Sequence, residues 1–177
     1  MIMGDNRKPN FACTRNDDYN TPICAWEFLL SELACVPSHI WAPFFCDGSI
    51  KTKLKRIDID IIHEDRDFFT WEPEQYDVII DNCPFSIKKQ ILRKCVDLQK
   101  PFALLLPIDT LERKYIADMF GEDNKFQVLI PKRRYNFCDN KKSIPFKSVW
   151  ICYDMKLRSS LQLIYEKNLQ RLEKIFQ

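Results

Sequence analysis

The stretch YDVIIDNCPFS, residues 76–86, constrains the fold of this chain more than any other part of its sequence. Residues 76–80 are almost continuously apolar and rich in β-branched side chains, which is typical of a strand buried on both faces of a parallel sheet. The run ends abruptly in Asp81-Asn82-Cys83-Pro84, and open α/β sheets place their chemistry at the carboxyl ends of such strands. A helical pattern over 87–98 and a second apolar run over 101–107 follow, so the sequence predicts a β-α-β unit here.

Helical and extended patterns alternate on both sides of this unit. Thr21 is predicted as an N-cap and Pro22 as the first residue of a helix that ends before Pro37. Together these patterns predict a three-layer αβα sandwich with a mostly parallel sheet, preceded by a loose arm over 1–18 and formed as a single domain by 19–177. Further strands are predicted over 39–45, 57–63, 126–130 and 148–153, further helices over 111–120 (with Gly121 as its C-cap) and 161–176, a basic helix after Ser49, and a short strand or loop through Trp71.

Composition narrows the function classes only slightly. The chain has 177 residues, of which 46% are hydrophobic, so it can build a sizeable core. It contains no apolar run of about 20 residues, and its N-terminus lacks a signal-peptide core, so we expect an intracellular protein without membrane contact. The net charge of +2 excludes nothing, because a nucleic-acid binder needs one basic face. Eight scattered cysteines without a CxxC pair, and two histidines, predict no metal site.

The turn after the first predicted strand reads PFFCDGS, residues 43–49. In doubly wound folds such a turn brings backbone amides and the start of a helix up to a ligand. Gly48 permits close approach to the backbone. An ordinary strand-to-helix turn is the alternative, because the segment holds a single glycine.

An acidic cluster follows the predicted strand over 57–63. A carboxylate at the end of the second strand can accept both hydroxyls of a ribose, a role open to Glu64 or Asp65. Asp67 and Phe68 are suited to the edge and the face of an adenine ring. A solvated charged loop is the alternative interpretation of these residues.

The turn Asn82-Cys83-Pro84-Phe85 is suited to holding a planar amine. The Asn82 side-chain oxygen can accept one hydrogen of the amine and the backbone carbonyl of Cys83 the other, which directs the nitrogen lone pair towards an electrophile. Pro84 stiffens the turn, and Phe85 offers a ring face for a flipped base. The alternative is a plain strand-ending turn, since Asn and Pro are common in turns.

Residues 131–147 combine cations with aromatic rings, which fits phosphates and bases of a nucleic acid. A solvated loop is the alternative. The residues that we assign to nucleic-acid contacts are Lys132, Arg133, Arg134, Tyr135, Lys141 and Lys142.

In order, the motifs PFFCDGS, DFF, YDVIIDNCPFS and PFALLLP resemble those of the S-adenosylmethionine-dependent DNA adenine-N6 methyltransferases, especially the small enzymes of phages and large DNA viruses. The usual forms in that family look like PFxGDGS and (D/N)PPF or (D/N)PPY. RRYNF and PFKSVWICY resemble the late strands of the family, so the similarity runs from about Thr21 to Tyr153.

The resemblance implies a Rossmann-like methyltransferase fold, S-adenosyl-L-methionine as cofactor and a flipped adenine in double-stranded DNA as substrate. It implies methyl transfer by direct attack at the turn Asn82 to Phe85, without a covalent enzyme intermediate. If the protein is viral, its location would be the cytoplasm or nucleus of the host. The cofactor contacts implied by the resemblance are Thr21, Pro22, Phe44, Asp47, Gly48, Glu64, Asp65, Asp67 and Phe68.

Two departures from the family pattern keep other functions open. Cys46 stands where the first glycine is usual, and a side chain there weakens cofactor binding if the position needs a positive φ. Cys83 stands where the first proline is usual. A catalytically degenerate protein that binds nucleic acid or a partner protein is therefore the main alternative, and a methyltransferase acting on RNA, protein or a small amine is another.

The methyltransferase hypothesis makes two geometric requirements of the structure and needs a source of target specificity. Asn82 has to face the cleft, and the space beside Gly48 has to be open to the cofactor. The chain lacks room for a large target-recognition domain, so the segment 131–147 reads the DNA, or specificity is low, or a homodimer or partner subunit supplies it.

Overall fold

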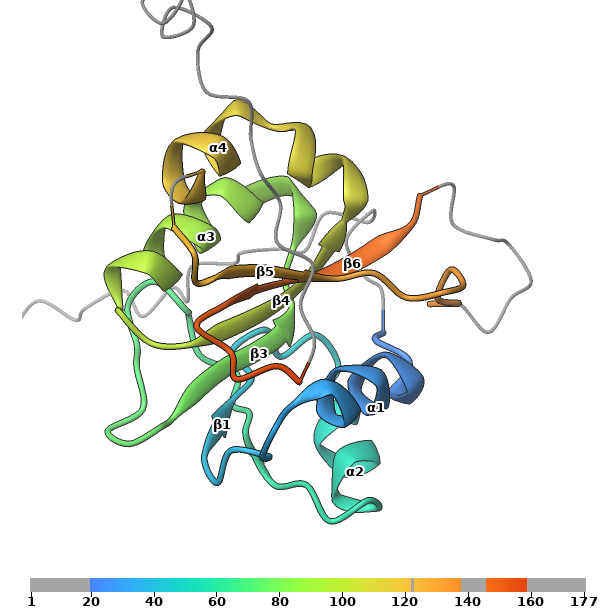
Figure 1. The fold of residues 1–177 in the computed structure, drawn as a ribbon. Coiled ribbons are helices and arrows are strands. Elements are labelled where there is room, and N and C mark those ends of the chain that lie inside the picture. The colour runs from blue at the N-terminus through green and yellow to red at the C-terminus, as the bar shows by residue number, and fades with distance from the viewer. Residues whose placement is uncertain (1–19, 122, 138–145, 159–177) are drawn as a thin grey trace, which may run out of the picture.

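A computed structural model describes residues 20–121, 123–137 and 146–158. In these residues the strands form one six-stranded sheet in the order β2-β1-β3-β4-β6-β5 (Figure 1). All neighbouring strands run parallel except β6, which is antiparallel to β4 and β5. The strands are β1 (Ile40–Trp41), β2 (Ile61–Ile62), β3 (Val78–Asn82), β4 (Phe102–Pro107), β5 (Phe126–Leu129) and β6 (Ser148–Tyr153).

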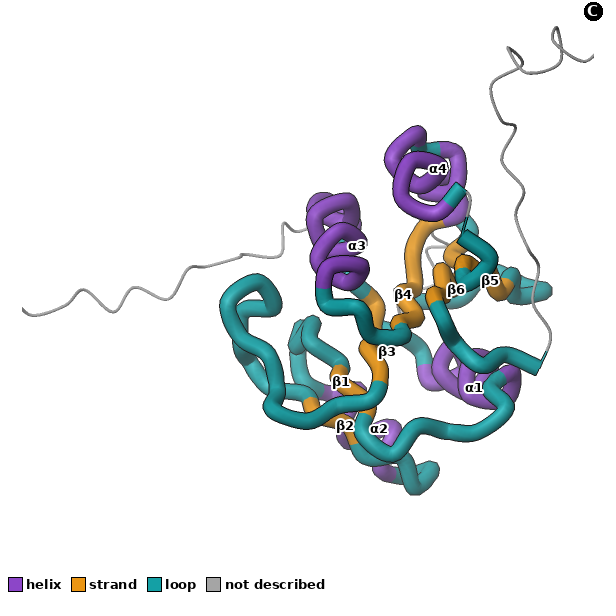
Figure 2. The backbone as a smooth tube through the Cα atoms, turned by 60° about the vertical axis from the view of Figure 1, so that its left-hand side comes forward, coloured by secondary structure: helices purple, strands orange, loops and turns teal. Residues whose placement is uncertain are grey.

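Helices cover both faces of the sheet. The helices α1 (Ile23–Glu32) and α2 (Ser49–Lys55) pack on one face, and α3 (Lys88–Asp97) and α4 (Lys114–Phe120) pack on the other. Figure 2 shows the sheet between these two layers. The predicted three-layer αβα sandwich with a mostly parallel sheet is confirmed.

Strand alternation divides the core into two clusters, because successive side chains of a strand point to opposite faces. On the α1 side, Trp150 meets Trp26 edge to face at 6.1 Å and donates a hydrogen bond from Nε1 to the Ala25 carbonyl at 3.0 Å. On the α3 side, the rings of Phe120 and Phe126 stack at 4.8 Å. The long strands β3 and β4 are buried on both faces, as the apolar run of the sequence predicts.

The order of the strands reverses between β1 and β3. The chain passes from β1 to β2 at one edge and then returns to form β3 on the other side of β1, with Ile40 opposite Val78. The carboxyl ends of β1 and β3 therefore meet at a topological switch point, which is where open α/β sheets bind ligands.

Several boundaries differ from the predictions. The strands expected over 39–45 and 57–63 shrink to two residues each, because Pro43 has no N–H for the ladder and Asp58 adopts a positive φ of 59°. Pro22, and not Thr21, is the N-cap of α1, and no side chain caps that helix. The stretch through Trp71 is a loop, the second of its two predicted alternatives, with a turn over 68–70.

The helix expected over 111–120 is divided. A short 3-10 helix over Ile108–Glu112 ends first, and α4 begins at Lys114. Gly121 is the C-cap of α4, as predicted. The expected arm over 1–18 and the helix over 161–176 lie outside the described residues, so the domain division stays a prediction. None of the helices in the described part of the chain has the length and apolar character needed to cross a membrane.

Candidate active site

The turn after β1 is built on two left-handed residues. Gly48 has a φ of +71° and its N–H donates to the Phe45 carbonyl at 2.7 Å. Cys46 also lies in the left-handed region, with a φ of +48°, which costs an L-residue about 1–2 kcal/mol. The turn thus has a positive φ at Cys46, the position at which the methyltransferases that the sequence resembles usually have glycine.

Asp47 orders the end of this turn. One oxygen of its exposed carboxylate accepts the Ser49 N–H at 2.9 Å, and the other accepts the Asn20 side-chain amide at 2.9 Å. The Ser49 N–H is the largest cause of a lowered pKa for the Asp47 carboxyl. Asp47 is therefore ionised at neutral pH and ties the segment before α1 to the turn.

The space beside Gly48 is filled, contrary to the open space that the methyltransferase hypothesis requires. A Cβ atom placed on Gly48 would lie 2.7 Å from Cζ of Phe45. The Phe45 ring in turn stacks on the imidazole of His63 at 5.1 Å. A ligand that occupies the space beside Gly48 has to displace the Phe45 ring. A separate open depression of about 400 Å³ lies on α2, lined by Lys51, Thr52, Lys55 and Arg56.

His63 is a buried polar residue beside the candidate site that sequence analysis did not single out. It follows β2 directly, is 4% exposed, and its Nδ1 lies 2.7 Å from the Ala42 carbonyl. Because a carbonyl only accepts, Nδ1 carries the proton. Burial, the largest cause, lowers the His63 pKa, so the ring is neutral at pH 7. Nε2 is buried and has no hydrogen-bond partner among the described residues. In the sequence, the position of His63 at the end of an apolar run was the signal that could have identified it.

The carboxylates after His63 point to solvent. Glu64 is exposed and lies 3.7 Å from Nε of Arg66, and Asp65 is exposed beside it. Asp67 is half-buried, and its carboxylate accepts the Phe69 N–H at 2.8 Å. Asp67 thus shapes the local turn, and the ribose role predicted for Glu64 or Asp65 stays a prediction.

Phe68 differs from its prediction. Its side chain is 4% exposed, with ring contacts to Trp41 at 5.3 Å and to Phe44 at 5.2 Å. Lys94 of α3 covers it further, through a hydrogen bond of 2.6 Å to the Phe68 carbonyl. The ring that was expected to meet an adenine is therefore packed in the core of this structure, where it covers Trp41 of β1 on the α3 side of the sheet.

Asp81 joins the two candidate turns. One of its oxygens accepts the Phe44 N–H at 2.7 Å and the other accepts the Asn82 N–H at 2.8 Å. Its side chain is buried, and burial raises its pKa to about 8 against the opposing effect of these two donors. A carboxyl in an otherwise apolar strand was the sequence signal for this link, and sequence analysis did not use it.

The first two residues of the turn at the end of β3 are fixed by strand pairing and by burial. Asn82 is the last residue of β3, pairs with Leu105 of β4, and is half-buried. Cys83 is 2% exposed in the core below α3, and burial raises the pKa of its thiol. Such a thiol is protonated at neutral pH and acts as a small apolar group.

The last two residues of this turn lead into a short 3-10 helix over Phe85–Ile87. Pro84 is the residue that caps its start. The half-buried Phe85 meets Phe146 edge to face at 5.5 Å. An aromatic pair from two distant parts of the chain therefore stands next to Asn82.

The residues before α1 that are predicted to contact a cofactor lie on the α1 side of the sheet. Thr21 is buried, and Pro22 precedes a helix that packs on the core cluster containing Ile40 and Ile80. By strand alternation, Asn82 faces this same side. The fold thus brings the N-terminal segment, the turn after β1 and the turn after β3 to one end of the sheet.

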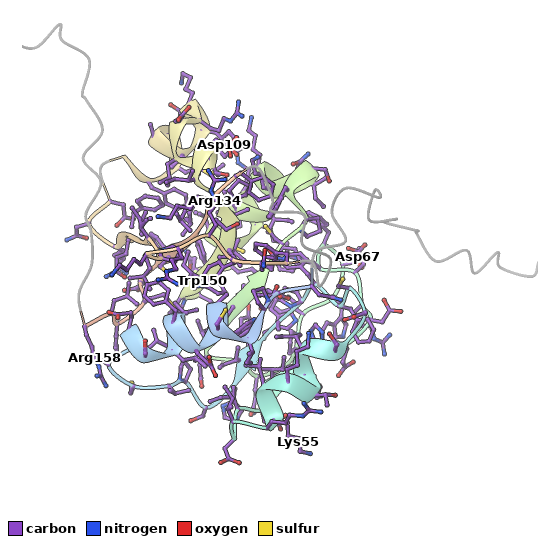
Figure 3. The ribbon with its side chains drawn as sticks, turned by 90° about the vertical axis from the view of Figure 1, so that its right-hand side faces the viewer. Lys55, Asp67, Asp109, Arg134, Trp150 and Arg158 are labelled. Atoms are coloured by element: carbon purple, nitrogen blue, oxygen red, sulfur yellow. The ribbon has the colours of Figure 1, made fainter. Side chains whose placement is uncertain are left out.

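The basic segment follows β5. Lys132, Arg133 and Arg134 are exposed, whereas Tyr135 is half-buried against the α1-side cluster, and burial raises its pKa. In Figure 3, Arg134 lies on the same part of the molecule as Asp109, and Lys55 of α2 lies at the opposite end. Lys141 and Lys142 lie outside the described residues.

The chain was compared with known proteins. No family model matches it, and no curated protein does. Among solved structures it is similar to the crystal structure of a dimethyladenosine transferase from Plasmodium falciparum, with a TM-score of 0.46 and 11% identity over 76% of this chain. The match spans 62% of that chain. These comparisons assign no family, so a function has to be argued from the chain's own residues.

Proposed function

We propose that this protein transfers a methyl group from S-adenosyl-L-methionine to the N6 amine of adenine in DNA. The observation that supports this best is the Asp81 carboxyl, which bonds the Phe44 N–H after β1 and the Asn82 N–H after β3. It couples the two turns at the switch point of the sheet, where a donor and an acceptor have to meet. Proximity and orientation of this kind are a large part of the rate enhancement of group transfer.

The turn after β3 supplies the groups that a planar amine needs. The Asn82 side-chain oxygen accepts one N6 hydrogen and the Cys83 carbonyl accepts the other, so the lone pair points out of the ring plane. The bound cofactor supplies an electrophilic methyl group on a sulfonium. The nitrogen forms a bond to the methyl carbon as the carbon–sulfur bond breaks, and N6 then loses a proton to solvent.

Two groups of residues supply the nucleic-acid contacts in this proposal. The half-buried pair of Phe85 and Phe146 supplies ring surface for an extruded base. Lys132, Arg133 and Arg134 are exposed, and none of them forms an ion pair with another described residue. Free cations of this kind suit phosphates. Target specificity comes from the segment 131–147 or from a second subunit.

A catalytically degenerate, nucleic-acid-binding or protein-binding module is the second candidate. It is favoured by the Phe45 ring, which fills the space beside Gly48, and by the side chain of Cys46 at a φ of +48°. In this case the basic segment still binds DNA with a strong salt dependence, but no cofactor enters the turn after β1.

The deciding experiment has two parts. Titration calorimetry with S-adenosylmethionine should give measurable heat with the wild type, and no heat would favour the degenerate module. Transfer of labelled methyl groups to DNA should then fall at least about hundredfold in Asn82→Ala, because the amine loses its acceptor.

Asn124→Ala is the matched control for this loss. Asn124 is exposed in the turn before β5, outside the proposed site and the segment 131–147, so its removal should leave the transfer rate within about twofold. Wild-type transfer no faster than that of Asn82→Ala would end the proposal. Competition by RNA and by free nucleosides separates a DNA enzyme from one that acts on RNA or on a small amine.

A further inference from the structure

A ring stack closes the turn after β1. The Phe45 ring lies over Gly48, 2.7 Å from where a Cβ would stand, and against the imidazole of His63 at 5.1 Å with an interplanar angle of 27°. Phe45 itself is half-buried, so part of its ring faces solvent. The ring can therefore rotate outward without first unpacking the core.

Beneath this ring lies a polar atom without a partner. Nε2 of His63 is buried, while Nδ1 is oriented by the Ala42 carbonyl at 2.7 Å. A neutral imidazole with its proton on Nδ1 presents Nε2 as a hydrogen-bond acceptor. Native proteins rarely leave such an atom unsatisfied, so this exception calls for an explanation, and a group that binds there is one.

We propose that Phe45 is a side-chain gate over His63, and that a nucleoside ligand entering beside Gly48 displaces the ring and donates a hydroxyl hydrogen bond to Nε2 of His63. This inference rests on the proposed function, which provides the nucleoside. It moves the hydroxyl acceptor from the carboxylates after β2 to a neutral imidazole. The exposed Glu64, already 3.7 Å from Arg66, then stays in solvent.

The chemistry selects a ligand with a hydrogen-bond donor and an apolar or aromatic body. A displaced ring leaves space bounded by the imidazole face and the Gly48 backbone, which suits a ribose with its base. A ligand that presents a carboxylate or a phosphate to this atom is disfavoured, since the neutral Nε2 accepts a hydrogen bond and does not donate one. The ligand class is thus a nucleoside with free ribose hydroxyls.

Two pairs of variants test the gate by calorimetry with S-adenosylmethionine. Phe45→Ala removes the closed state and should bind about tenfold more tightly if the wild-type gate is closed about nine-tenths of the time. Phe28→Ala, which removes a half-buried ring on α1, should leave the affinity unchanged.

The second pair tests the acceptor. His63→Asn keeps a polar group near the position of Nδ1 but loses Nε2, so it should bind S-adenosylmethionine about tenfold more weakly. His63→Gln keeps a polar atom near the position of Nε2, so it should bind almost as the wild type does.

The hydroxyl contact has its own test. Adenosine and 2′,3′-dideoxyadenosine compete with S-adenosylmethionine for the site, and the dideoxy form should compete about tenfold less well in the wild type. In His63→Asn the two nucleosides should compete equally, because the acceptor is gone. An equal loss in both proteins would mean that the hydroxyls bind elsewhere, which overturns the inference.

Nitrogen NMR of the imidazoles gives a readout that does not depend on activity. The chain has two histidines, and the exposed His39, 3.3 Å from Asp77, serves as an internal reference. The Nε2 signal of His63 should shift on addition of S-adenosylmethionine while that of His39 stays in place. Without ligand, the His63 pKa should rise in Phe45→Ala, because burial is the main cause that lowers it. Lys51 lowers it further, whereas the backbones of Ala42 and Phe45, which the variant keeps, and the Asp47 carboxylate raise it.

The outcomes separate this inference from the proposed function. If the wild type binds S-adenosylmethionine but the His63 signal stays fixed and Phe45→Ala binds no more tightly, the gate is overturned and the methyltransferase proposal stands. If neither the wild type nor Phe45→Ala binds, both are overturned. Tighter binding by Phe45→Ala together with a moved Nε2 signal supports the gate.

Discussion

The two candidate turns end strands of very different length. The turn after β3 closes a strand of five residues next to β4 with six, and all but one of these eleven residues are buried. The turn after β1 closes a strand of two residues next to β2 with two. Parallel ladders of many bonds hold a turn in place, whereas two-residue ladders permit rearrangement.

This difference assigns separate tasks to the two halves of the sheet. The half formed by β3 and β4 positions Asn82 rigidly, as a group that orients an amine has to be positioned. The half formed by β1 and β2 carries a strained Cys46 and the ring of Phe45, both of which a ligand can reorganise. Asp81 is the link through which order in one turn reaches the other.

The largest expected effect separates the halves directly. Ile80 of β3 and Ile61 of β2 are both buried, at 0% and 3% exposure. Ile80→Ala should lower the free energy of unfolding by about 4 kcal/mol, because the central sheet cannot collapse around the cavity. Ile61→Ala should cost about 2 kcal/mol, because an edge strand of two residues can adjust. Urea unfolding measures both values, and equal losses would remove the contrast between the halves.

A smaller effect tests the link itself through pH. The Asp81 carboxyl has a pKa of about 8 in the folded protein against 3.8 for the free group. Between these values the folded state binds a proton that the unfolded state has lost, so this group makes stability fall as pH rises from about 4 to 8. Asp81→Asn should remove that dependence, which amounts to roughly 3 kcal/mol between pH 5 and pH 7.

The control for this prediction is Asp77→Asn. Asp77 is exposed and accepts the His39 N–H at 2.9 Å, which is the main cause of its lowered pKa. Its folded pKa lies below that of the free group, so its contribution is lost only as pH falls through that lowered value. Asp77→Asn should leave the slope between pH 5 and pH 7 as in the wild type. An unchanged slope in Asp81→Asn would mean that Asp81 is ionised in the fold.

Sequence patterns predicted the order of the elements and much less of the site. Periodicity locates α3 within a residue at each end, because an amphipathic pattern over 87–98 is a local property. The same reasoning overextended β1, since HIWAPFF is apolar both in a strand and in a packed turn. The contacts that define the site join residues far apart, such as Phe44 and Asp81, which are 37 positions apart in the chain. No local pattern reports the Phe45 ring over Gly48.

The smallest effect concerns Cys46, the strained residue of the weaker half. Cys46→Gly should raise the free energy of unfolding by about 1 kcal/mol, because glycine adopts a φ of +48° without steric cost, less the entropy it gains in the unfolded chain. Gln99→Gly is the matched control, since Gln99 has a φ of +53° after α3, on the other face of the sheet. Both changes should raise the urea midpoint similarly, but Cys46→Gly alone should tighten S-adenosylmethionine binding, because it alone relaxes the turn that the ligand has to enter. Tighter binding in both proteins would attribute the gain to global stability. A lower urea midpoint in Cys46→Gly would show that the contact of the thiol with Oδ1 of Asn20, at 3.5 Å, stabilises the turn by more than the positive φ of Cys46 destabilises it.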